Sequence, residues 1–593
     1  MKRLLLIGLF ALIFHVVAMG VYLRNGLQGN IDFHILSSSH FGVPKPLADR
    51  GLRPLYEDGV YLGWDGQFYY YIANDLRGSP ETMKHIDTPG YRYQRIGLPL
   101  LAKAASIVTF QGWVSPTLYY LTYLLLLVAG TMAAGLLLQS VGCHPAWSLL
   151  WTLSAGTQLT LLNGLPDAAA DAFFLIGLAC LRSNRRVWVW LSVIPLSFMV
   201  LSREAYVALP VLLFLFFGLD RLRAAGTEGR LASVAAWIKS PAFICLAVPV
   251  LAFAAVQIAV RFGLNVDPGA AQGILGPPLK AWWRFWSSGI SGVHPFVGAG
   301  AHARSEFVLL TIFLALLVIT FVLSIRLFVV AYHRRAPLDQ ALGATAAVFC
   351  VLYLFFADAV MMHYSGYMKV ASIFLFLVPY MNARKDELAG QGQIGGRVFA
   401  QAWQWCVREP GKKFLYAFLI VAALYGGIHV WEERILPENR PLYWPYTRVT
   451  EPRSTNAAEC LPAYKARFDV LEERPFPLPD TRYNRLFPPP TTKLIRVRAT
   501  NLTDRPFANT SAPGAVNLSY QWLDSAGHLI SDGIRTFVPG GIAPQASAEA
   551  WLVAEYPRQP GRYILRISAV QESCSWFHTK DPSSAVDLSV EVR

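Results

Sequence analysis

One short stretch of the sequence combines a carboxylate with residues suited to substrate binding. Asp65 stands between Trp64 and Gly66, and Gln67 and Tyr69 follow within an aromatic run. A carboxylate can take a proton from a hydroxyl group, and glycine permits a tight turn or close approach of a ligand. Asp65 is therefore our candidate catalytic base, with Gln67 and Tyr69 as candidate substrate-binding residues. The alternative is that Asp65 only caps an amphipathic helix.

Two arginines three residues apart follow this stretch. On a helical turn, Arg92 and Arg95 would share one face and could bind a phosphate through charge-assisted hydrogen bonds. Alternatively, they extend toward lipid head groups. Glu57 and Asp58 form another acidic pair, but their Tyr and Gly neighbours favour a turn, and we rank the pair below Asp65.

Three more ionisable clusters adjoin hydrophobic segments. They are Asp167 after a proline, Arg203 with Glu204, and the group His363, Tyr364 and Lys369. Cations such as Arg203 and Lys369 could bind the phosphate of a leaving group, and the polar neighbours could contact substrate. Helix capping or a structural Arg203–Glu204 ion pair would require no catalysis.

The segments that must position these residues are hydrophobic. Of 593 residues, 54% are hydrophobic and 15% are charged, whereas a soluble domain has about 25% charged residues. This composition excludes an ordinary soluble enzyme. The net charge of +14 raises the question of nucleic-acid binding, but Lys and Arg lie mainly between hydrophobic runs. We therefore expect no nucleic-acid partner and assign the basic residues to membrane topology.

Hydropathy predicts an α-helical polytopic membrane protein with about eleven spans. The expected spans are 4–23, 116–139, 146–163, 166–181, 187–201, 205–219, 242–260, 307–330, 341–356, 370–381 and 414–431. A retained signal-anchor would place the N-terminus in the cytoplasm. Alternate threading then puts most Arg and Lys clusters on the cytoplasmic side, as the positive-inside rule requires. All candidate site residues fall on the opposite face, where 24–96 and 261–304 form the first and second periplasmic loops.

The sequence changes character after residue 432. A Pro-rich tether is expected over 433–490, and period-two alternation over 491–593 predicts a β-sandwich on the outer face. Of seven cysteines, only Cys460 and Cys574 lie in this outer part. An oxidising compartment would permit a disulfide between them, although two free thiols remain the alternative.

Taken together, these motifs resemble those of bacterial polytopic GT-C glycosyltransferases, which use lipid-phosphate-linked sugars, as the mannosyl- and arabinosyltransferases of the cell envelope do. The resemblance covers residues 1–432 in layout and is closest around Asp65. It implies that Asp65 is the catalytic base and that Arg203 and Lys369, with Arg92 and Arg95, hold the donor phosphate. Many such enzymes have two adjacent acidic residues in this loop, whereas Asp65 has none beside it. A divalent cation is therefore possible but unsupported, and we assign no metal ligand.

These expectations define a glycosyltransferase of the bacterial plasma membrane. It would transfer a sugar from a polyprenyl-phosphate donor to an envelope glycan, lipid or protein acceptor at the periplasmic or extracellular face. No cofactor is expected besides this donor substrate, and the oligomeric state is left open. A transporter or flippase of lipid-linked sugars is the rival, and an envelope scaffold is a third alternative. The clustering of ionisable residues at one face and the lack of a clear repeat disfavour a carrier.

Overall fold

The computed structural model describes most of the chain. The described residues are 2–27, 29–54, 63–183, 185–224, 235–269, 274–290, 293–294, 298–299, 301–389, 409–435, 460–476, 491–508, 515–536, 538, 541–557, 559–571 and 574–592. Glu57, Asp58 and most of the expected tether lie outside these ranges.

Seven helical segments of the described residues are long and apolar enough to cross a membrane, and they make the chain a multi-pass membrane protein. They are α1 (Lys2–Asn25), α7 (Pro116–Ser140), η3 with α13 (Glu204–Arg223), α15 with η4 (Phe243–Gly263), α17 (Ala301–His333), α18 (Pro337–Leu354) and α23 with η5 (Lys412–Ile435). An eighth span results if α9 (Ala155–Leu162) and α10 (Asp167–Leu181), which are bent by 118°, are counted as one.

The described spans are fewer than the eleven expected because several apolar segments form short or broken helices. These helices are η2 (Pro145–Ser148), α8 (Leu149–Leu153), α11 (Arg186–Leu191), α12 (Val193–Ser202), α20 (Tyr364–Ala371) and α21 (Phe374–Ala389). One break lies at Ser154, whose backbone is extended and whose hydroxyl accepts a hydrogen bond from Thr157 N at 3.3 Å. Hydropathy counts apolar residues but does not detect such a cap, which ends one helix and begins the next.

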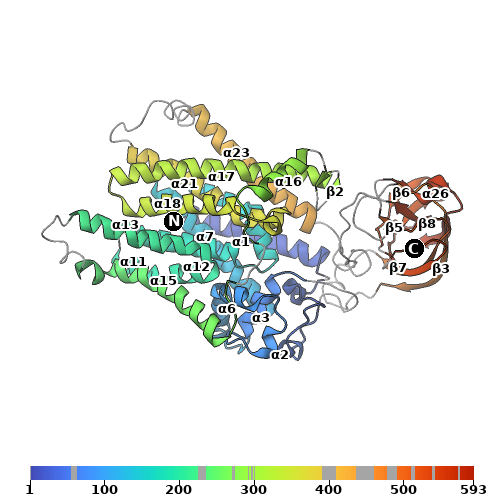
Figure 1. Ribbon diagram of the computed structural model, residues 1–593, viewed down its shortest axis with the longest axis horizontal. Coiled ribbons are helices and arrows are strands. Elements are labelled where there is room, and N and C mark those ends of the chain that lie inside the picture. The colour runs from blue at the N-terminus through green and yellow to red at the C-terminus, as the bar shows by residue number, and fades with distance from the viewer. Residues whose placement is uncertain are drawn as a thin grey trace.

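The helices pack around one large apolar core. Helix α10 packs against α7 and α12. Helix α17 packs against α18 and α21 (Figure 1). The first loop adds short helices beside this bundle: η1 (Ile31–Ile35), α2 (Lys45–Ala48), α3 (Gly66–Asn74), α4 (Pro80–Met83), α5 (Pro89–Tyr93) and α6 (Gly97–Val108). The second loop contributes α16 (Lys280–Ile290) and the short strands β1 (Val293–His294) and β2 (Gly298–Ala299), and α19 (Asp358–Met361) precedes α20.

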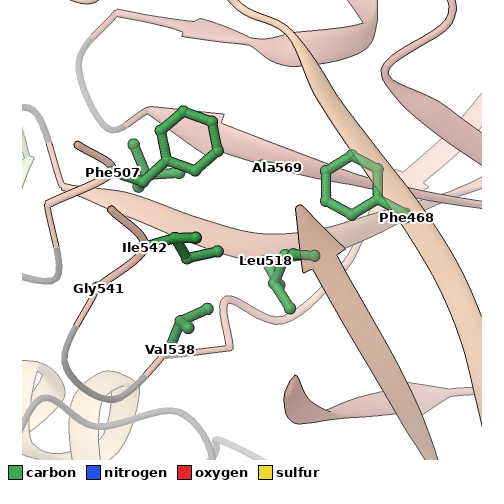
Figure 2. A pocket seen from close by; sticks show the side chains of 9 residues that line it. Phe468, Phe507, Leu518, Val538, Gly541, Ile542 and Ala569 are labelled. Atoms are coloured by element: carbon green, nitrogen blue, oxygen red, sulfur yellow. The ribbon is translucent and has the colours of Figure 1, made fainter. Parts of the chain in front are cut away.

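The C-terminal part is a β domain of two antiparallel sheets, drawn in red in Figure 1. One sheet has the order β3 (Ala466–Pro475), β4 (Thr492–Asn501), β7 (Ser547–Glu555). The other has the order β10 (Ala585–Val592), β8 (Gly561–Gln571), β5 (Val516–Asp524), β6 (Leu529–Asp532), with β9 (Ser575–Trp576) paired to β8 and followed by α26 (Phe577–Lys580). Alternate side chains of both sheets form a common core. Its interior gap is apolar and has a volume of about 10 Å³, which leaves no room for a ligand (Figure 2).

Two boundaries differ from those expected. Strand β3 pairs with β4 along its whole length, so the β domain begins before residue 491 and includes part of the expected tether. Cys460, which precedes β3, forms a disulfide with Cys574. At the other boundary, the helical domain continues past residue 432, because η5 (Trp431–Ile435) ends with a buried Ile435 whose carbonyl accepts a hydrogen bond from Asn25 Nδ2 at 3.2 Å.

Candidate active site

Asp65 begins helix α3 against the turn that joins α9 to α10. A Cβ atom on Gly66 would lie 1.6 Å from the carbonyl oxygen of Asn163, so only glycine permits this contact. The turn is itself fixed from α7, where Tyr119 donates a hydrogen bond to the carbonyl of Gly164 at 3.0 Å. Asp65 therefore lies beside the segment that leads into Asp167, the first residue of α10.

A buried arginine orients Asp65. Arg92 donates a hydrogen bond from Nη1 to Asp65 Oδ2 at 3.0 Å, and its Nη2 lies 3.0 Å from Asp65 Oδ1 in an ion pair. On its other edge, Arg92 donates from Nε and Nη2 to Asp87 at 2.9 and 2.7 Å. Nη1 also donates to the hydroxyl of Tyr69 at 3.4 Å. Arg92 thus makes four hydrogen bonds to protein groups and orients Asp65. The phosphate contact expected for Arg92 stays a prediction.

Asp65 is an ionised carboxylate open to solvent on one side. Its side chain is 48% exposed, whereas that of Arg92 is only 7% exposed. Burial alone would raise the pKa of Asp65, but the positive charges of Arg92, Lys369 and Arg95 outweigh this effect and hold the pKa below its ordinary value. The site thus presents an anionic oxygen pair that an approaching hydroxyl can reach.

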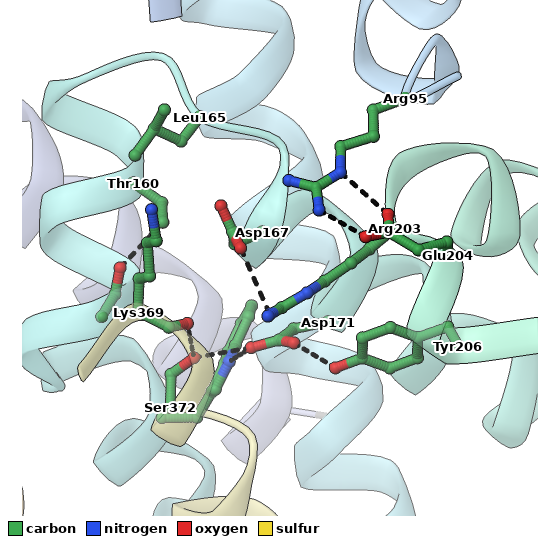
Figure 3. Close-up of polar contacts among 12 residues, drawn as sticks. Arg95, Thr160, Leu165, Asp167, Asp171, Arg203, Glu204, Tyr206, Lys369 and Ser372 are labelled. Atoms are coloured by element: carbon green, nitrogen blue, oxygen red, sulfur yellow. Dashed lines mark hydrogen bonds and ion pairs between the residues drawn. The ribbon is translucent and has the colours of Figure 1, made fainter. Parts of the chain in front are cut away.

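Two arginine–carboxylate pairs lie next to Asp65. Arg95 binds Glu204 through two hydrogen bonds, of 2.8 Å from Nε and 2.5 Å from Nη2. Arg203 lies 3.2 Å from Asp167, and both of these side chains are buried. Figure 3 shows Arg95 and Arg203 extending toward the same region beside Asp167. These expected residues come from three parts of the sequence and converge because α6, α10 and α12 pack together.

Asp171 was missed by the sequence analysis. It follows Asp167 by one helical turn, is 2% exposed, and accepts hydrogen bonds from Trp151 at 3.0 Å and Ser372 at 2.7 Å. The hydroxyl of Tyr206 donates to its other oxygen (Figure 3). Asp171 thus joins α8, η3 and the α20–α21 junction, which carry or adjoin the site residues. An acidic residue inside an apolar helix was the available signal.

Lys369 reaches the same area from α20. A Cβ atom on Gly156 would lie 2.4 Å from the carbonyl oxygen of Met368, so α9 and α20 are in backbone contact just before this lysine. The positive charge of Lys369 contributes to the lowered pKa of Asp65. The phosphate contact expected for Lys369 stays a prediction.

His363 and Tyr364 belong to a second polar cluster. His363 Nε2 lies 3.4 Å from Glu306 and 3.5 Å from Glu433, and the ring of Tyr364 packs against His429 with 4.7 Å between centroids. This cluster joins α17, α20 and η5. His363 and Tyr364 thus support these helix ends, and their expected substrate contact stays a prediction.

Arg434 connects the second cluster to the Asp65 turn. Its guanidinium lies 4.2 Å from the centroid of Trp64, and its Nη2 donates to Asn163 Oδ1 at 3.3 Å. Arg434 was not among the expected site residues, because it lies beyond the expected end of the helical domain at residue 432. Arg434 is thus a fifth cation around the candidate base.

Gln67 and Tyr69 support the loop. Gln67 is fully buried and accepts a hydrogen bond from Ser38 N at 2.8 Å, and Tyr69 is 1% exposed beside Arg92. Neither side chain is at the surface, so both hold the loop in place of the substrate contact expected from sequence. In the described part of the chain, no group of three or more His, Cys, Asp or Glu side chains is arranged to hold a metal ion.

Comparisons with known proteins give weak matches. No family model and no curated protein matches the chain. Among solved structures, the oligosaccharyltransferase of Archaeoglobus fulgidus in its apo form is 14% identical, with a TM-score of 0.30 over 64% of this chain and 53% of that chain. The same organism's AglB, in complex with an inhibitory peptide and a dolichol-phosphate, is 14% identical, with a TM-score of 0.30 over 72% of this chain and 56% of that chain. The chain spans about half the length of these structures, so its function has to be argued from the site itself.

Proposed function

We propose that the protein is an inverting membrane glycosyltransferase of the GT-C type, with a polyprenyl-phosphate-linked sugar as donor. The observation that carries the proposal is a half-exposed carboxylate, Asp65, fixed by a hydrogen bond and an ion pair from Arg92, with further cations nearby. A fixed base beside a cluster of cations suits a reaction in which a hydroxyl group loses a proton while a phosphate leaves.

In the proposed reaction, the acceptor hydroxyl gives its proton to Asp65. The hydroxyl oxygen forms a bond to the anomeric carbon of the sugar while the bond from that carbon to the phosphate oxygen breaks. The leaving polyprenyl phosphate takes the electron pair, and Arg203, Lys369 and Arg95 neutralise its charge. A single displacement inverts the configuration at the anomeric carbon.

Two arginines retain donors for this phosphate. Among the described contacts, Arg95 uses Nε and Nη2 for Glu204, and Arg203 uses Nη1 for Asp167. The two guanidinium groups extend toward the same region, where their like charges repel each other (Figure 3). A phosphate beside them would relieve this repulsion and accept the remaining donors, which favours an anionic donor over a neutral one.

The acceptor is proposed as an envelope glycan, lipid or protein. The location proposed for the reaction is the outer face of a bacterial plasma membrane, because the positive-inside pattern assigns the opposite helix ends to the cytoplasm. The β domain follows η5 in the chain, and Arg434 of η5 contacts Trp64 next to the base. We propose that the β domain presents the acceptor.

A donor-consumption assay tests the proposal. Purified full-length protein would be incubated with a panel of polyprenyl-phosphate sugars and candidate acceptors, and released polyprenyl phosphate would be measured. Asp65→Asn should abolish turnover while donor binding is retained, and Asp49→Asn, an exposed aspartate of the same loop, should leave both unchanged. A transporter would release no polyprenyl phosphate and would tolerate Asp65→Asn, and that result would refute the enzyme.

A further inference from the structure

A second candidate binding site lies at the other end of α10. An apolar groove with a volume of about 600 Å³ runs between α7 and α10 and ends at polar residues near α11. Its apolar wall includes Ala129, Met132 and Leu136 of α7. Because α10 has 15 residues and rises 1.5 Å per residue, the polar end lies about 22 Å from Asp167. The groove is therefore separate from the candidate active site.

The length of the groove matches one leaflet of a bilayer. From Ala129 to Ser140, α7 rises about 16 Å, while half of the hydrocarbon core is about 15 Å thick. Ala129 and Leu136 are exposed, so the groove is accessible from the side that faces lipid. An acyl chain can lie along it without entering the protein core.

The polar end of the groove is cationic. Arg182 lines it, and its Nη1 donates to Asp339 at 2.8 Å and to the hydroxyl of Tyr380. Among the described contacts, Arg182 makes its hydrogen bonds through Nη1 alone, so its other two nitrogens are available for a ligand. Exposed Arg185 and Arg186 follow, and no acidic residue is among the described residues lining the groove.

Asp339 fixes Arg182 without cancelling the positive charge of this end. The carboxylate of Asp339 is also bound by Arg384, at 3.1 and 2.9 Å. Arg384 also pairs with Glu387 at 2.6 Å, so two carboxylates balance Arg182 and Arg384, and the excess positive charge comes from the exposed Arg185 and Arg186. A phosphate group is the ligand that complements such a set.

From this combination we infer that the groove binds an anionic phospholipid. One acyl chain lies against α7 and α10, and the phosphate lies at Arg182, with Arg185 and Arg186 on its outer side. The lipid belongs to the leaflet at the Arg182 end of the bundle, which the positive-inside pattern assigns to the cytoplasm. This inference is independent of the proposed transferase activity.

Photocrosslinking tests the site in the full-length protein. The protein would be reconstituted in nanodiscs with phosphatidylglycerol that carries a diazirine near the end of one acyl chain, and labelled peptides would be mapped by mass spectrometry. We expect labels on 129–140 and 176–183. Replacing the probe by the matching phosphatidylcholine should reduce labelling there. Equal labelling by the two lipids, or labels elsewhere only, would overturn the inference.

Two variants with matched controls distinguish the binding of the lipid's acyl chain from the binding of its head group. Ala129→Trp should block the groove and remove the labels, whereas Leu125→Trp, one turn away on the same helix and outside the groove lining, should retain them. Arg185→Gln with Arg186→Gln should reduce the preference for phosphatidylglycerol by about fivefold per cation. Replacing the exposed Arg335 and Lys413 by Gln should leave it unchanged. If both double variants behaved alike, the preference would come from net charge and the assigned phosphate site would be wrong.

Discussion

Arg92 and Asp65 form a two-point pair in which each terminal nitrogen of the arginine binds one carboxylate oxygen at 3.0 Å. Asp87 binds the opposite edge of the same guanidinium. The candidate base is therefore oriented by a residue that is itself oriented. A planar, forked side chain is needed for this arrangement, and lysine cannot reproduce it.

Arg92→Lys should lower turnover by about a hundredfold, because a misplacement of about 1 Å at a reacting group has an effect of that size. Donor consumption at saturating donor measures it. Because the variant retains the positive charge, a loss of turnover would result from the changed orientation of Asp65. Arg77→Lys, at an exposed position of the same loop, is the control and should retain full turnover.

The low pKa of Asp65 predicts that turnover changes little with pH on the acidic side of neutrality. A carboxyl whose pKa lies below 3.8 in the folded protein stays ionised at pH 5, and the stabilisation it contributes is lost only as the pH falls through that lowered value. Turnover of the wild type should therefore not decline between pH 7 and pH 5 through Asp65. In Arg92→Gln the positive charge that lowers the pKa of Asp65 is lost, while burial still raises this pKa. The acidic limb of the pH profile of kcat/KM should therefore move upward by about 1–3 pH units. An unshifted pH profile of kcat/KM in this variant would show that Asp65 is not the group that titrates.

Gly66→Ala should disrupt the site more than its size suggests. The new methyl group would collide with the carbonyl of Asn163, so α3 or the α9–α10 turn has to move. We expect lower turnover together with a lower Tm. Gly20→Ala is a suitable comparison, because no atom lies within 4 Å of the added carbon, and it should leave both quantities unchanged. Wild-type turnover in Gly66→Ala would contradict the close packing at this turn.

Removal of the disulfide should destabilise the β domain selectively. Cys460 and Cys574 are 114 residues apart, so the bond constrains a long loop in the unfolded state. Replacing both by serine should lower the free energy of unfolding of the β domain by about 2–4 kcal/mol. Pulse proteolysis of full-length protein in urea, with fragments separated by size, measures this. Cys143→Ser with Cys180→Ser removes two free thiols of the helical domain and should leave the β domain unchanged.

The sequence predicted the parts of this site that have a local signature. The Trp-Asp-Gly sequence identified Asp65, and charges at the ends of apolar segments identified Arg203, Glu204 and Lys369. The pairings were not predictable, since Arg95 and Glu204 are 109 residues apart and meet only when the helices pack. Local patterns carry no information on such partners, and this is also why the double role of Arg92 was not foreseen.

The errors in the expected spans have a similar origin. Apolar content fixed where helices lie, but the cap at Ser154 and the bend between α9 and α10 depend on hydrogen bonds and turns that hydropathy does not measure. The alternation that predicted the sandwich was more reliable, because strands with one buried face must alternate. Strand β3 was missed because its exposed half, from Leu471 to Pro475, lacks this alternation.

The contact between Arg434 and Trp64 determines where the protein can be divided. A truncation after residue 432 would remove the guanidinium that stacks beside the candidate base, along with the buried Ile435. Inactivity of such a fragment would then say nothing about the sandwich. A cut after Ile435 keeps Arg434 and separates the loss of the β domain from damage to the candidate active site.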